Sequence, residues 1–167
     1  MRVMETSIRA LVKKYAPADL HDLAYDPLAA SLFMPFNPRD PFSPAWDDGC
    51  RHSDPLVFVT KFLSQLSSVN DLVIEGFHCH LIWTLYVKAK TLMKVSIQNC
   101  HRVLLACLVL AMKWVEDDFQ DEIKDFLMYL PFEMFSRITR PSMLAAMESY
   151  LFLDVFHGQL PFFYLQF

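Results

Sequence analysis

The feature that most constrains this fold is a stretch between residues 97 and 116 in which fourteen of 20 residues are apolar. Apolar side chains occur on every side of the helix that this stretch would form, and such a helix must be covered by neighbours all round. The longest unbroken apolar run, 103–112, is too short to span a bilayer, which takes about 20 helical residues. The sequence therefore predicts a central helix buried within a helical bundle.

The flanking sequence supplies helices to surround it. Asp54-Pro55 is a favoured helix start, with Asp as the N-cap and Pro at the first position, and an apolar face continues to about residue 67. Further helices are predicted over 73–92, over 121–130 and from Pro141 to about Val155, with Gly158 following, and no alternation typical of a strand is visible. The predicted fold class is all-α, a single five-helix unit around a buried third helix.

The first 53 residues have a different character, because they hold six of the ten prolines. A helix is expected before Pro17, where Ile8, Leu11, Val12 and Tyr15 follow helical spacing. Prolines interspersed with aromatic residues then exclude a regular helix, and we expect this segment to lie extended against the domain or against a partner. The chain thus divides into an N-terminal helix and Pro/aromatic extension over 1–53 and a helical domain over 54–167.

Composition excludes several classes of function. With 167 residues the chain fits one domain, and at 54% apolar residues it is not intrinsically disordered. A net charge of −4 argues against nucleic acid as a partner, and the three glycines are too far apart to build a nucleotide-binding loop. Charged residues at the N-terminus do not fit a signal peptide, so we expect a soluble protein of the cytoplasm or nucleus with no membrane partner.

Residues 99–118 carry a resemblance to a known family. The sequence Asn-Cys-His-Arg leads into an apolar run that ends in Lys-Trp and an acidic pair. This pattern resembles the third helix of the yeast phosphate-regulatory cyclins, and a five-helix unit around such a helix is the layout of a cyclin box. Met147-Glu148 falls at the acidic position of the family's fifth helix, whereas residues 126–132 lack the glycines of its fourth. The chain is similar to a divergent cyclin with a single box.

This resemblance implies a regulatory subunit that binds and activates a cyclin-dependent protein kinase by packing on the kinase's regulatory helix. Lys113 and Glu148 then correspond to residues that hydrogen-bond the kinase backbone, although spacing alone makes Lys113 an ordinary solvated lysine. Phe119, Tyr150 and Phe152 either form an apolar patch for the kinase or belong to the core, and the sequence leaves both open. The alternative function is a cyclin-fold adaptor or scaffold in transcription or signalling that activates no kinase.

Histidine and cysteine residues raise the question of a metal site or a catalytic nucleophile. His78 and His80 are two positions apart on a predicted helix and face different directions, and there is no Cys-x-x-Cys motif. Three cysteines lie in apolar helical sequence, where thiols are inert: Cys79, Cys100 and Cys107. We therefore expect no metal, no cofactor and no catalytic residue, and a small helical enzyme remains the least supported hypothesis.

A small basic stretch is formed by Lys88, Lys90 and Lys94. Solvated lysines at the end of a helix are the ordinary interpretation of such a stretch. Attraction of an acidic substrate or partner is the functional alternative.

Overall fold

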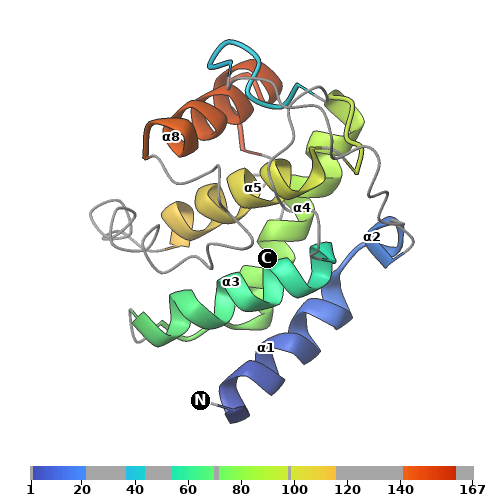
Figure 1. The fold of residues 1–167 in the computed structure, drawn as a ribbon, viewed down its shortest axis with the longest axis vertical. Coiled ribbons are helices and arrows are strands. Elements are labelled where there is room, and N and C mark those ends of the chain that lie inside the picture. Colours follow the sequence, from blue (N-terminus) through green and yellow to red (C-terminus); the bar gives the residue numbers. More distant parts are fainter. Residues whose placement is uncertain are drawn as a thin grey trace.

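The computed structural model describes residues 2–21, 37–43, 54–69, 72–97, 99–115 and 141–160, and its regular elements within these ranges are all helical (Figure 1). This confirms the all-α fold class. In chain order the elements are α1 (Arg2–Tyr15), α2 (Ala18–His21), α3 (Pro55–Val69), α4 (Gly76–Leu92), α5 (Cys100–Val115), α8 (Pro141–Ser149) and the π-helix η2 (Tyr150–Val155). The helix expected over 121–130 lies outside the described residues.

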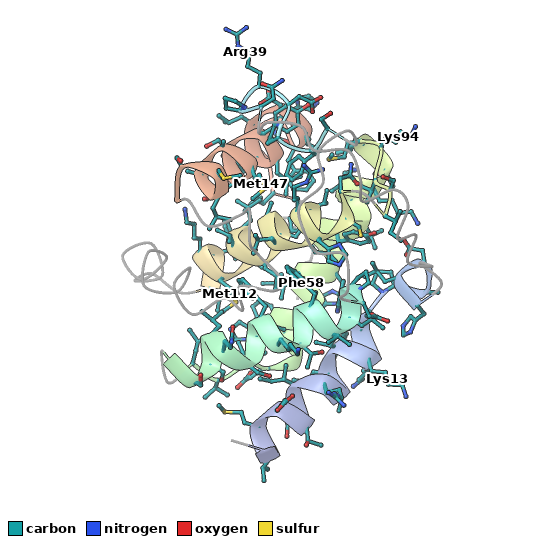
Figure 2. All side chains as sticks on the ribbon, viewed as in Figure 1. Lys13, Arg39, Phe58, Lys94, Met112 and Met147 are labelled. Atoms are coloured by element: carbon teal, nitrogen blue, oxygen red, sulfur yellow. The ribbon has the colours of Figure 1, made fainter. Side chains whose placement is uncertain are left out.

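Helix α5 is the centre of the fold, as its composition predicts. Every residue from Cys100 to Met112 is buried. Helices α3, α4 and α8 all contact α5, and Figure 1 shows it lying between α3 and α8 with α4 crossing behind. In Figure 2, Phe58 of α3 and Met147 of α8 lie on opposite sides of α5, and both are fully buried. The absence of a polar stripe on α5 thus follows from neighbours on each side.

Capping side chains determine the residues at which α3 and α4 begin. The Asp54 carboxylate accepts a hydrogen bond of 2.7 Å from the backbone N–H of Leu56, so the predicted N-cap of α3 is present. Helix α4 was expected from residue 73 but begins at Gly76. Glu75 and His78 form a reciprocal capping box there, in which the His78 ring accepts from the backbone N–H of Glu75 at 3.1 Å.

The C-terminal helix changes its winding part-way. Helix α8 begins at Pro141, as predicted, and the expected apolar stripe is buried at Leu144 and Met147 of α8 and at Leu151 and Val155 of η2. From Tyr150 onward the helix is wound as the π-helix η2, which the sequence did not indicate. Gly158 closes the element with a φ of 73° and donates a backbone hydrogen bond of 2.8 Å to the Phe152 carbonyl.

Both described parts of the N-terminal extension pack on the helical domain. Helix α1 contacts α3 and α4, and its Ile8 and Val12 side chains belong to the same core as α5. Residues 37–43, here called the strap, form turns beside α8 (Figure 1), and Phe42 is 2% exposed. The side chain of Asn99 donates to the Phe42 carbonyl at 3.0 Å, and Arg102 donates to the Ser43 carbonyl at 2.8 Å. Asn99, directly before α5, and Arg102, in its first turn, therefore hold the strap in place.

Candidate functional site

Lys113 and Glu148 lie together although 35 positions separate them in the chain. Lys113 stands in the last turn of α5, directly after the buried run, and Glu148 is next to the last residue of α8. The lysine Nζ donates to both carboxylate oxygens, at 2.8 Å to Oε1 and 2.7 Å to Oε2. Their side chains are 20% and 18% exposed, so the pair lies at the edge of the core and still reaches solvent.

The paired groups retain capacity for further hydrogen bonds. An ammonium group has three protons, of which Lys113 uses two on Glu148. A carboxylate has about four acceptor positions, so Glu148 can accept from other donors while it holds the lysine. The pair can therefore bind a further acceptor through Lys113 and a further donor through Glu148 at the same time.

Tyr150 and Phe152 follow Glu148 on η2 and are both half-buried. Their side chains pack against the core, and the Tyr150 ring meets Phe42 of the strap edge to face at 5.8 Å between centroids. Each of the two side chains therefore packs part of its surface against the core and leaves another part accessible to solvent. Phe119, the third aromatic residue expected here, lies outside the described residues.

The comparisons with known proteins give no family. No protein-family model, no curated protein and no solved structure matches the chain. The function therefore has to be argued from the residues and their geometry.

Several features beside the pair were not found from sequence. Trp114 follows Lys113 and is 46% exposed, and Leu153 follows Phe152 and is 58% exposed. Both were overlooked because an apolar residue within a helical pattern is ordinarily assigned to the core. Single exposed apolar side chains are common on protein surfaces, so these two do not by themselves establish an interaction surface.

The histidine and cysteine residues are arranged for packing. His78 is buried and His80 is exposed, so they face different directions, as their spacing predicts. His101 meets the Phe58 ring edge to face at 5.4 Å. Burial raises the pKa of the Cys79 thiol to about 11 and also raises the pKa of Cys107, which keeps both protonated near neutral pH. No group of three or more possible metal ligands occurs among the described residues.

Within the described parts of the chain, no helix combines the length and the apolar character that a membrane crossing requires.

Proposed function

We propose that the chain is a cyclin-like regulatory subunit that binds a cyclin-dependent protein kinase and activates it by packing on the kinase's regulatory helix. The observation that carries the proposal is the ion pair between Lys113 and Glu148. The cyclin resemblance assigns these two positions a joint role, and an independent argument from geometry supports it, because the pair stands at the edge of the core with hydrogen-bonding capacity to spare.

In the proposed complex the pair binds the backbone of the kinase where it leads into the regulatory helix. Lys113 donates its third proton to a carbonyl, and Glu148 accepts from a backbone N–H. The accessible parts of Tyr150 and Phe152 extend this polar anchor into an apolar contact. Polar groups at the edge of an apolar surface fix the orientation of a partner more than they add affinity.

Activation in this mechanism is conformational. A kinase regulatory helix held inward completes the lysine–glutamate pair that positions the ATP phosphates. The subunit performs no chemistry itself and acts only through stronger contacts with the active state of the kinase. To convert a kinase that is about 1% active into one that is about 99% active, it must bind the active state about 10⁴-fold more tightly.

The test begins with affinity capture from lysate of the source organism, followed by mass spectrometry. The baits are wild type, the Lys113→Ala/Glu148→Ala double variant and a control, Glu5→Ala/Arg9→Ala, that removes the same two charges from an exposed pair on α1. We expect a protein kinase with wild type and the control, and its loss with the site variant. Capture of no kinase by any bait would refute the proposal.

A second step separates an activator from an adaptor. The captured kinase is purified, and its phosphorylation of a peptide substrate is measured with and without the wild-type chain. An increase in kcat/KM that the site variant does not produce is the expected result. A kinase that binds the chain with unchanged activity would favour the adaptor function.

A further inference from the structure

A second surface, separate from the Lys113–Glu148 pair, is hollowed between the end of α1 and the outer face of α4. It is a cavity of about 530 Å³, within the usual size range of binding pockets. Tyr15 and Pro17 line it from the N-terminal side, and Trp83 and Val87 line it from α4. The walls therefore present aromatic and aliphatic surface to a bulky apolar group.

The shape of the pocket follows from the contact between Tyr15 and the start of α4. A Cβ atom on Gly76 would lie 2.9 Å from the Tyr15 hydroxyl, so the absence of a side chain there lets the ring stand against α4. His80 meets the same ring edge to face at 6.3 Å. Tyr15 is thus held as a fixed wall of the pocket.

The rim of the pocket is cationic. None of the lining residues is acidic, and Lys88 is an exposed lining residue with no ion-pair partner among the described residues. Lys14 places its Nζ 5.1 Å from the centroid of the Tyr15 ring. The nearby carboxylate of Asp19 is already held by Lys90 at 2.7 Å. The charge that a ligand meets on this side of the pocket is therefore positive.

The length of the pocket indicates the kind of ligand. Its lining on α4 extends from His80 to Thr91, which at 1.5 Å per residue is about 16 Å along the helix. An extended peptide of about five residues covers that distance. The hydroxyl of Thr84 already donates to the His80 carbonyl, so this proton is not available to a ligand.

We propose that this pocket binds a linear peptide segment of a partner protein, with a bulky apolar side chain in the pocket and acidic residues beside Lys88. The pocket shares no residue with the Lys113–Glu148 pair, so the inference does not depend on the proposed kinase regulation. Aromatic walls anchor the apolar side chain, and the cationic rim selects its acidic neighbours.

The test measures fluorescence anisotropy of labelled short peptides in which a central Phe is flanked by acidic, neutral or basic residues. We expect the full-length chain to bind the acidic peptide best. Lys88→Glu should weaken that binding about tenfold. Thr84→Phe, which fills the pocket, should abolish binding. Lys61→Glu, the same charge change on the exposed face of α3, should bind like wild type.

The location of binding is checked by NMR. The chain has three tryptophans, and Trp83→Phe identifies which indole N–H signal belongs to the pocket. That signal should shift on addition of the acidic peptide. The inference is overturned if no peptide binds, if neutral or basic peptides bind as tightly as the acidic one, or if Lys88→Glu and Thr84→Phe bind like wild type. Equal displacement of the peptide by inorganic phosphate alone would indicate a simple anion site and would also overturn it.

Discussion

Removing one partner of the Lys113–Glu148 pair should destabilise the fold at least as much as removing both. An exposed ion pair contributes at most about 1 kcal/mol, whereas taking one partner from a fully buried pair costs about 3–5 kcal/mol. Both side chains here are about four-fifths covered. We therefore expect Lys113→Met and Glu148→Gln each to lower the free energy of unfolding by about 2 kcal/mol, because each leaves a largely covered charge without its partner.

The double variant should lose no more than about 2 kcal/mol, since it leaves no unpaired charge, and the coupling energy is then at least about 2 kcal/mol. The assay is urea unfolding followed by far-ultraviolet circular dichroism. With a slope of about 2 kcal/mol per molar urea, each single variant should unfold about 1 M below wild type, and the double variant should unfold at no lower urea concentration than the single variants.

The refuting result is additivity. A double variant that unfolds about 2 M below wild type, or single variants within about 0.3 M of it, would show that the two residues do not stabilise each other. Glu5→Gln and Arg9→Met remove an exposed pair with a separation of 4.0 Å and should show almost no coupling. The same measurement on Lys113→Ala/Glu148→Ala shows whether that variant is folded enough to serve as a bait for kinase capture.

Two other perturbations test the strap and the core. Arg102→Met keeps about the same side-chain volume but removes the hydrogen bond to the Ser43 carbonyl, which should loosen the strap. Trypsin should then cleave after Arg39, an exposed residue of the strap (Figure 2), at least about fivefold faster than in wild type. Mass spectrometry of the digest measures the rate. Burial raises the pKa of Cys79 from 9.0 to about 11, so the unfolded chain loses this proton first and stability falls between pH 9 and pH 11. The urea midpoint should therefore decrease less between pH 9 and pH 11 for Cys79→Ala than for wild type.

Much of the helical framework could be predicted from the sequence because burial leaves a direct signal there. An uninterrupted apolar run indicated α5, and the stripe from Leu144 to Val155 indicated α8 and η2. The start of α4 was wrong because Glu75 and His78 are not among the side chains that usually cap a helix. The π-helix could not be predicted either, because its apolar spacing is close to that of an α-helix.

The candidate site was less accessible to sequence reasoning. Nothing in the local sequence pairs Lys113 with Glu148, and only the family resemblance brought them together. The contacts of the strap were missed because the local sequence predicts a different environment for Arg102 from the one that it has. An arginine at the start of a helix is ordinarily solvated, yet Arg102 is fully buried and binds a backbone carbonyl 59 positions away.

The polar residues of α5 show why the site lies where it does. A helix covered on every side can place polar groups only at its ends, since a buried polar group in the middle would need a partner within the core. Asn99 and Arg102 therefore hold strap carbonyls at one end, and Lys113 meets Glu148 at the other, about 16 Å away along the axis. Phe42 of the strap packs on Tyr150, which lies two residues beyond Glu148. Through this ring contact the strap packs on the same C-terminal helical segment that carries Glu148.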